Sequence, residues 1–310
     1  MKRHLLAALC LMGAVSIQAQ MTKVKVAYQP GDTVIYHCTE KQVIEQPMGG
    51  NIGIDKSYDE RIVVKSKNDE GYILEVKIDD PKLDGGGVDD LEQLLENLSD
   101  AMCANVPVEV QTDADGKILS IVNKDAVVSQ MLENMNRLFT NLENQKPEAK
   151  EVLQNARVNM VEKMLTSETI MRKMFFDEAN PLALNGKTLM TGMIESHEKD
   201  LGLKYNNVYT VTDKGKTVKV NSKLSLTRDQ LKAFVLEQVE KTAPQQLEMI
   251  KQNIDMVLDS GMMKLESNEN STYTFNDRGW VESIVTDEKQ DAMGAKVSSS
   301  GEQKITYKNF

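Results

Sequence analysis

The feature that most constrains the fold of this chain is a β-hairpin pattern that occurs twice. Residues 108–122 alternate apolar and polar side chains on both sides of a turn sequence, Thr-Asp-Ala-Asp-Gly, that ends at Gly116. Residues 273–285 alternate in a similar way around a turn that ends at Gly279. Glycine supplies the positive φ that such turns require, and Asp or Asn side chains bond to the local backbone. The sequence therefore predicts two similar hairpins, aligned on these two glycines.

The order of elements around the hairpins repeats as well. The glycines at positions 31, 71 and 116 correspond to those at positions 186, 215 and 279, with unequal offsets. Because turn chemistry alone can reproduce glycine spacings, coincidence stays open as an alternative to duplication. Strands grouped with helices are typical of an α+β protein, with antiparallel sheets and helices packed on one face. We expect two related units, residues 20–145 and 184–310, joined by a helical connector, residues 146–183.

Helices and strands are predicted from the spacing of apolar residues. Apolar residues at i, i+3, i+4 and i+7 predict helices at 91–102, 125–142, 148–165, 168–176, 227–239 and 244–258. Alternating residues predict further strands at 33–43, 58–66, 72–78, 208–212, 217–226 and 303–307. Thr227 is expected to cap the helix that follows it, since a Thr side chain can accept a hydrogen bond from the first turn.

The first 19 residues have the features of a secretory signal peptide. A basic start, Lys2-Arg3, precedes a short apolar run that ends in small residues at Ala19. This pattern predicts cleavage after Ala19. An uncleaved anchor and a lipoprotein acylated at Cys10 are the alternatives. No later stretch approaches the ~20 apolar residues of a membrane-spanning helix. We therefore expect an exported protein, periplasmic in a Gram-negative cell, and not a transmembrane protein.

Net charge limits the classes of binding partner, and cysteine content limits the disulfides that can form. Removal of Lys2 and Arg3 reduces the Lys and Arg count from 37 to 35 against 47 Asp and Glu, so the mature net charge is −12. An acidic protein is a poor candidate for binding nucleic acid or anionic membranes, which require basic patches. Two cysteines remain, Cys38 and Cys103. An oxidising compartment permits a disulfide between them, and two separate buried thiols are the alternative.

No catalytic, cofactor or metal motif is present in the sequence. The two histidines after the leader, His37 and His197, lack a Cys or His at metal-ligand spacing. Residues 196–199 match S-x-x-K, but the S-D-N and K-T-G motifs that complete this serine chemistry are absent. The turn before Gly116 resembles part of a calcium loop, yet Val122 stands where the loop requires Glu. We therefore expect no catalytic residue, no metal and no cofactor.

Methionine is the unusual component of the sequence. Sixteen of the 18 methionines lie after the leader, and several cluster on the predicted central helices. Met131 and Met135, and Met160 and Met164, are spaced at i and i+4. Such pairs either fill the core or line an adaptable apolar cleft. These four residues are the candidate ligand-binding side chains. The single tryptophan, Trp280, is either a packing residue or an exposed anchor at a partner surface.

Short motifs give the chain a family resemblance. The stretches at 31–34, 47–50, 113–122 and 276–285 carry a Gly-Asp strand start, a Met-Gly segment and two D-x-G-like hairpins. The pattern resembles exported proteins of Gram-negative bacteria that carry a domain of unknown function. The resemblance implies export and an α+β fold, and it brings no catalytic residue with it. A sheet curved around helices would also be similar in architecture to periplasmic lipoprotein carriers.

The sequence predicts a function class rather than a reaction. We expect a non-enzymatic binding or interaction protein of the cell envelope, whose ligand, if it has one, is apolar or lipid. An envelope protein is the other possible partner. The competing hypothesis is an envelope hydrolase whose site is assembled from scattered acidic residues. Converging carboxylates or histidines with perturbed pKa values would favour the enzyme, and an apolar cleft would favour the binding protein.

Overall fold

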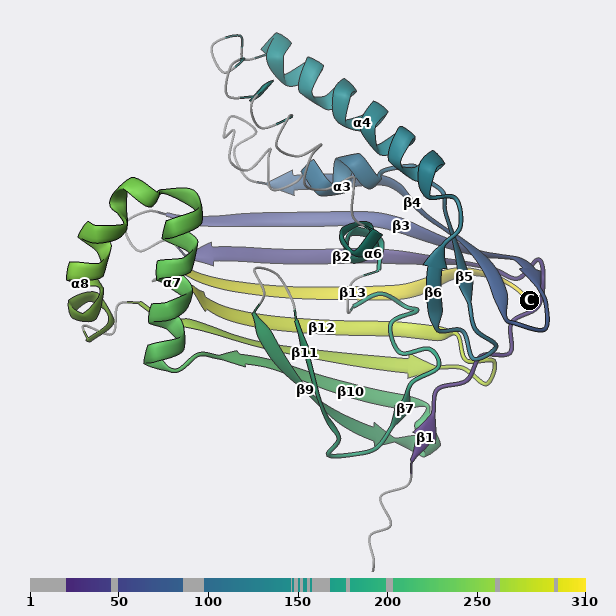
Figure 1. The fold of residues 1–310 in the computed structure, drawn as a ribbon. Helices are drawn as coiled ribbons and strands as arrows, with labels where there is room; N and C mark the ends of the chain where they lie inside the picture. Colours follow the sequence, from purple (N-terminus) through teal and green to yellow (C-terminus); the bar gives the residue numbers. More distant parts are fainter. Residues whose placement is uncertain are drawn as a thin grey trace, which may run out of the picture.

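The computed structural model describes residues 21–45, 50–85, 98–145, 147, 150, 153–154, 157, 168–176, 179–198, 203–259, 263–292 and 295–310. Eleven of its strands form one antiparallel sheet in the order β6-β5-β4-β3-β2-β13-β12-β11-β10-β9-β8 (Figure 1). A separate pair, β1 (Thr22–Lys23) and β7 (Thr188–Leu189), forms a short second sheet. The leader expected at residues 1–19 lies outside the described residues.

The first half of the sheet is a meander interrupted by a helix. Its elements are β2 (Thr33–Glu45), β3 (Asn51–Lys67), β4 (Tyr72–Gly85), α3 (Leu98–Cys103), β5 (Val108–Thr112) and β6 (Ile118–Ile121). Two more helices follow, α4 (Lys124–Gln145) and α6 (Glu168–Phe175). The connector expected at 146–183 and the start of the helix expected at 91–102 lie mostly outside the described residues.

The second half also has helices between its strands. It consists of β8 (Ile194–Glu198), β9 (Lys204–Thr212), β10 (Thr217–Ser225), α7 (Arg228–Thr242), α8 (Leu247–Asp259), β11 (Leu265–Phe275), β12 (Val281–Ala292) and β13 (Ala295–Asn309). In both halves a helical excursion separates the third strand from the fourth. β13 pairs with β2 over most of its length, so the two halves share one sheet. The predicted α+β class with antiparallel pairing and sheet-packed helices is confirmed, and common descent of the halves stays a prediction.

The two hairpins predicted from the sequence have the same turn. In the first, Asp113 Oδ1 accepts hydrogen bonds from the N–H groups of residues 115 and 117. In the second, Asn276 Oδ1 accepts from the N–H groups of residues 278 and 280. Gly116 and Gly279 have φ of 88° and 80°, the left-handed region that favours glycine. The alignment of the two glycines is therefore confirmed at the level of local structure.

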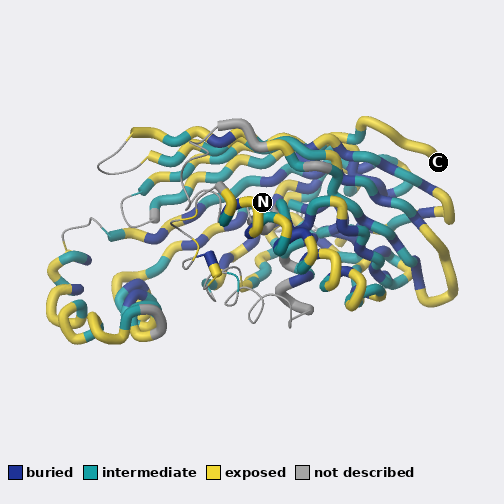
Figure 2. The backbone as a smooth tube through the Cα atoms, turned by 90° about the horizontal axis from the view of Figure 1, so that it is seen from above, coloured by how far each residue is buried: buried dark blue, intermediate teal, exposed yellow. Residues whose placement is uncertain are grey.

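The sheet curls because so many twisted strands cannot remain an open, flat layer. Seen from above, it forms one curved layer with α7 and α8 on one side (Figure 2). The N-terminal segment, residues 21–31, runs across the turns at one end of the strands. Val26 packs on the β5–β6 turn, Thr22 on the β9–β10 turn, and Lys25 on the β11–β12 turn. We call residues 21–31 the strap.

The main core lies between the sheet and α3, α4 and α6. Met131, Met135 and Phe139 of α4 have 0–1% of their surface exposed and belong to this core. Trp280 is fully buried and stacks on Tyr28 with ring centroids 3.9 Å apart, so it is a packing residue. Cys38 and Cys103 are both buried thiols, and no disulfide occurs among the described residues.

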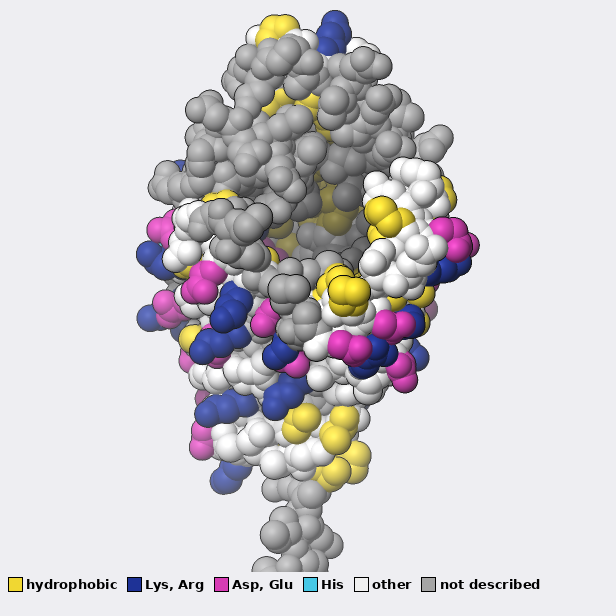
Figure 3. Space-filling model, turned by 90° about the vertical axis from the view of Figure 1, so that its left-hand side faces the viewer, with side chains coloured by type: hydrophobic (Ala, Val, Ile, Leu, Met, Phe, Trp, Pro, Cys, Tyr) yellow, Lys and Arg dark blue, Asp and Glu magenta, His cyan; other side chains and the backbone are white. Residues whose placement is uncertain are grey.

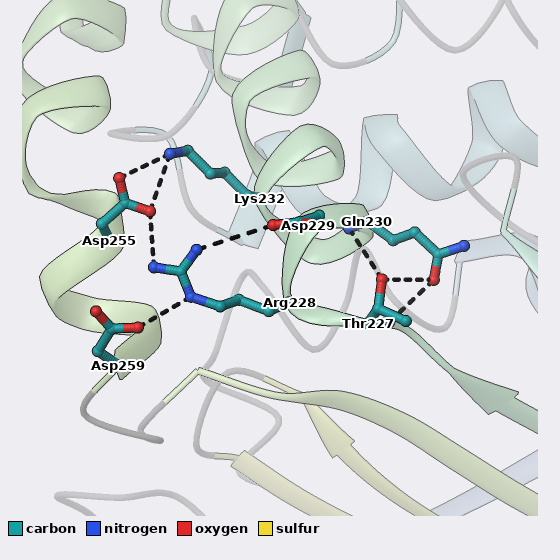
Figure 4. A network of polar contacts seen from close by, with 7 residues as sticks. All are labelled: Thr227, Arg228, Asp229, Gln230, Lys232, Asp255 and Asp259. Carbon is teal, nitrogen blue, oxygen red and sulfur yellow. Dashed lines mark hydrogen bonds and ion pairs between the residues drawn. The ribbon is translucent and has the colours of Figure 1, made fainter.

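A second, smaller core holds α7 and α8 against the far ends of β9, β10 and β11. It contains Leu231 and Val235 of α7, Ile254 and Leu258 of α8, and three strand residues, Tyr205, Leu224 and Leu265. The predicted Thr227 cap is present as a capping box with Gln230. On the surface, Arg228 bonds to Asp255 at 2.8 Å and to Asp259 at 2.9 Å (Figure 4). These exposed ion pairs add little to stability, so the apolar contacts hold the helical pair in place.

Candidate ligand-binding site

The two faces of the sheet differ in exposure. Side chains alternate along each strand, so one set points toward the helices and the other points away. The set that faces the helices, which we call the front face, is buried or half-buried, and the opposite set on the back face is mostly exposed. Any site enclosed by the fold therefore lies on the front face.

A continuous row of polar side chains crosses the front face. Paired residues in the register of β8 through β13 and β2 are Glu195, Asn207, Ser222, Glu269, Glu288, Ser299 and Gln42. We call these seven residues the polar row. Its two central carboxylates, Glu269 and Glu288, face each other on adjacent strands, and serine hydroxyls bond to both. Like charges directly opposite on a sheet destabilise it, so packing alone does not explain this arrangement.

A cavity of about 310 Å³ lies over one end of the polar row. Its polar lining includes Glu195, Asn207, Ser222 and Glu269 of the row. Its apolar lining includes Phe176, Leu182, Val220 and Tyr273. Both edge strands reach it, β6 through Ile118 and β8 through His197. The curled sheet thus brings its two edges to one cavity, which has an apolar part and a polar part.

Three side chains that line this cavity, Ser222, Asn207 and Asn185, have a buried polar atom without a hydrogen-bond partner. Ser222 is 2% exposed and Asn207 is 6% exposed. The Ser222 Oγ and the Asn207 Oδ1 make no hydrogen bond. A buried polar group left unsatisfied costs about 1–3 kcal/mol. Two such atoms on adjacent strands, both lining one cavity, are the expected signature of a site that hydrogen-bonds to a ligand or to water.

A second group of the lining, Lys187, Glu195 and Tyr209, is linked by mutual hydrogen bonds. Glu195 Oε2 accepts from Lys187 Nζ at 3.0 Å and from Tyr209 Oη at 2.6 Å. Burial lowers the pKa of Lys187, but the nearby Tyr209 and the hydrogen bond and charge of Glu195 outweigh it, and the pKa is raised. Burial raises the pKa of Glu195, but the bonds from Tyr209 and Lys187 outweigh it, and the pKa is lowered. Burial and the bond to Glu195 raise the pKa of Tyr209.

Two further hollows lie near the far ends of the strands. Viewed from the α7–α8 end, the molecule is hollowed near its centre, with hydrophobic side chains visible inside (Figure 3). Another hollow, of about 740 Å³, lies at the ends of β10 to β13. Its charged lining alternates in sign, with Lys223, Glu266, Lys289, Asp291 and Lys296 from the back face. Alternating charges are typical of a solvated surface, so we do not assign this second hollow to a ligand.

Two of the four methionine candidates from the sequence, Met131 and Met135, are not in the cavity. Met131 and Met135 fill the main core and line none of the described cavities, which agrees with the core alternative that the sequence left open. Met160 and Met164 lie outside the described residues, so a ligand-binding role for this pair stays a prediction. Among the described residues, no group of three or more His, Cys, Asp or Glu could hold a metal ion.

Sequence reasoning missed the polar row. A signal exists within single strands, because Asn207 interrupts Tyr205 and Tyr209, and Ser222 interrupts Val220 and Leu224, at positions where the alternation calls for apolar residues. The sequence does not show that these interruptions align across strands, since that depends on the pairing register. His197, for which the sequence shows no metal-ligand partner, is half-buried and lines the cavity.

No helix in the part of the chain that the structure describes has the length and apolar character required to cross a bilayer.

No protein-family model and no curated protein matches the chain. A solved structure described as lipid–protein interactions in lipovitellin is similar over 91% of this chain and 26% of that chain, with 12% identity and a TM-score of 0.41. This chain thus spans about a quarter of the length of that one.

Two further solved structures show weaker similarity. Ail, the attachment invasion locus protein of Yersinia pestis, is 5% identical over 91% of this chain and 100% of that chain, with a TM-score of 0.16. An outer membrane channel from Pseudomonas putida F1 is 6% identical over 91% of this chain and 97% of that chain, with a TM-score of 0.23. Similarities this low assign the chain to no family, and the site must be interpreted from its own geometry.

Proposed function

We propose that this protein is a non-enzymatic binding protein that holds a small amphipathic molecule in the front-face cavity. The observation that carries the proposal is the pair of unpartnered buried atoms, Ser222 Oγ and Asn207 Oδ1, in a cavity whose lining also contains apolar side chains. Binding sites typically combine an apolar wall with a few convergent polar groups that fix the orientation of the ligand. The apolar part of the ligand packs against Phe176, Leu182 and Val220.

The geometry favours binding over acid–base catalysis. A general acid or base works best with a pKa near the operating pH. In the hydrogen-bonded group, the pKa of Glu195 is lowered and the pKa values of Lys187 and Tyr209 are raised, so all three move away from neutrality. Their mutual bonds hold them in fixed ionisation states. They shape the wall of the cavity rather than transfer protons, which argues against the hydrolase alternative.

A substitution that fills part of the cavity tests the binding site. Val220 lies on the floor of the cavity, and Val220→Phe occupies part of it. The matched control is Val208→Phe, because Val208 is exposed on the back face of the adjacent strand β9. The probe is the neutral fluorophore N-phenyl-1-naphthylamine, whose emission rises in an apolar site. We expect saturable binding to the parent chain and to the Val208→Phe variant, and none to Val220→Phe.

Circular dichroism and thermal melting must show that both variants are folded. Absence of saturable binding to the parent chain, or equal loss in both folded variants, would contradict the proposed site. Native mass spectrometry with lipid extraction then identifies any apolar molecule that co-purifies. Co-purification would assign the ligand directly.

The proposal includes export of the protein to the cell envelope. The leader-like segment at residues 1–19 supports an envelope location. Intact-mass measurement on periplasmic material is expected to give a chain that starts at or near Gln20. A mass that retains Met1, or one that includes acyl chains on Cys10, would contradict cleavage after Ala19 and require a different location.

A further inference from the structure

We propose that the polar group of the ligand is an ammonium, which lies on the polar row between β9 and β11. The inference rests on the proposed binding function and specifies the chemical class of the ligand. Its evidence is the set of groups on the sheet wall of the cavity, which are hydrogen-bond acceptors and negative charges.

Asn207 presents an acceptor to the cavity. A hydrogen bond from the Asn207 side chain acts on Tyr209 and favours the ionised phenol, so the amide N–H is directed to that oxygen. The remaining amide atom, Oδ1, is buried, lacks a partner and can only accept. An ammonium N–H supplies the missing donor, whereas a carboxylate or phosphate would place one acceptor against another.

Ser222 and the carboxylates extend this acceptor surface. Ser222 pairs with Asn207 on one side and with Glu269 on the other, and its Oγ is buried without a partner. Glu288 follows in the same row and adds a second negative charge. Adjacent strands are about 4.8 Å apart, so one small group over β10 can reach acceptors on both neighbours. The three N–H bonds of a primary ammonium match Asn207, Ser222 and Glu269.

Two of the three Lys and Arg side chains that line the cavity bond to acceptors of the protein, and the third, Lys117, is exposed at the turn before β6. Lys187 bonds to Glu195 and Tyr209. Arg172 donates to the backbone carbonyls of Ile118 and Leu119 on the edge strand β6. Their donors satisfy protein acceptors, so they leave the sheet wall negative. The apolar wall accommodates the hydrocarbon part of an amphipathic amine.

Three ligands of equal chain length test the inference. Octylammonium, 1-octanol and octanoate are titrated calorimetrically into the full chain at neutral pH. We expect octylammonium to bind tightest and octanoate weakest, at least about tenfold apart, because charge-assisted hydrogen bonds are the strong ones. Tightest binding of octanoate, or equal binding of all three, would overturn the ammonium assignment and leave the binding function intact. Failure of all three to bind would count against the proposed function itself.

Variants with matched controls test whether residues of the polar row are responsible for octylammonium binding. Glu269→Gln and Ser222→Ala are expected to weaken octylammonium binding about tenfold each while octanol affinity stays unchanged. The controls are Glu266→Gln and Ser225→Ala, which alter the same residue types on the exposed back face of the same two strands. Equal losses in variants and controls would overturn the assignment.

Thermal melting separates a binding role of Ser222 from a structural one. Because its buried hydroxyl lacks a partner, Ser222→Ala is expected to raise the melting temperature of the ligand-free protein while it lowers ammonium affinity. A variant that melts at a lower temperature and keeps its affinity would show that the hydroxyl serves the fold, and it would overturn the assignment for this residue.

Discussion

The two ends of the strands are stabilised in different ways. At one end the strap crosses three hairpin turns. Side-chain atoms of Val26 and Thr22 and the backbone of Lys25 lie where a Cβ on the turn glycines would be. This end adjoins the main core, with Tyr28, Trp280 and α4. At the other end, α7 and α8 close the strands through the smaller second core, supplemented by exposed ion pairs. We call them the strapped end and the helical end.

The difference indicates where the molecule opens first. Local opening requires little free energy where few apolar contacts and many exposed polar contacts hold an element. The helical end fits this description, and the α8 residue Met256 is 73% exposed. The strapped end joins distant parts of the chain, so it is expected to open only on global unfolding. The comparison therefore predicts two levels of stability within one sheet.

The largest effect is expected in the main core. Phe139 of α4 is fully buried, and Phe139→Ala leaves a cavity among core side chains. Such a truncation typically costs about 3–5 kcal/mol. Urea denaturation followed by circular dichroism is expected to show this loss in one transition that involves the whole sheet. A loss of stability confined to part of the molecule would contradict the comparison. It would show that the main core does not unfold together with the whole sheet.

A core truncation at the helical end is expected to act locally. Ile254 is the most buried residue of α8, and Ile254→Ala removes contacts with α7 and the strand ends. The cost is about 2–5 kcal/mol, and we expect the lower part of this range because the second core is small. Hydrogen exchange should quicken in α7 and α8 and remain slow in β2 to β5. Met256→Ala, on the exposed face of the same helix, is the control. We expect it to change stability and hydrogen exchange little.

A turn substitution tests the strapped end. A Cβ on Gly279 would lie 2.1 Å from the carbonyl oxygen of Lys25, and the φ of 80° adds strain. Gly192 has a φ of 83° with nothing within 4 Å, so Gly192→Ala measures the backbone strain alone. We expect Gly279→Ala to destabilise by about 1–3 kcal/mol and Gly192→Ala by less. Equal denaturation midpoints for the two variants would show that the strap contributes nothing.

The smallest effect is expected from the ion pairs of the helical end. The pKa of Asp255 is lowered, mainly because Lys232 donates a hydrogen bond to it, with a further bond from Arg228. A lowered carboxyl pKa gives stability that is present above the unfolded value of about 4 and is lost as the pH falls through the folded value. Arg228→Gln should therefore be slightly less stable at neutral pH, with a difference that vanishes in acid and in high salt. A difference independent of pH would rule out this explanation.

The sequence by itself determined the local structure. Turn residues such as Asp113 and Asn276 specify their hairpins through bonds that span only a few residues, and Thr227 specifies a helix start in the same way. Apolar spacing correctly predicted α4, α7 and α8. It underestimated β13, predicted only at 303–307, because its residues 295–302 are polar and depend on pairing with β2 and β12.

Only the tertiary structure decided how the halves join and where the cavity lies. The sequence predicted two units, but the pairing of β13 with β2 across some 260 residues merges their strands into one sheet. The same register aligns Asn207, Ser222 and Glu269 on three strands. Each of these residues is ordinary in its own segment. Their alignment arises from long-range backbone pairing, which the composition of a single strand does not specify.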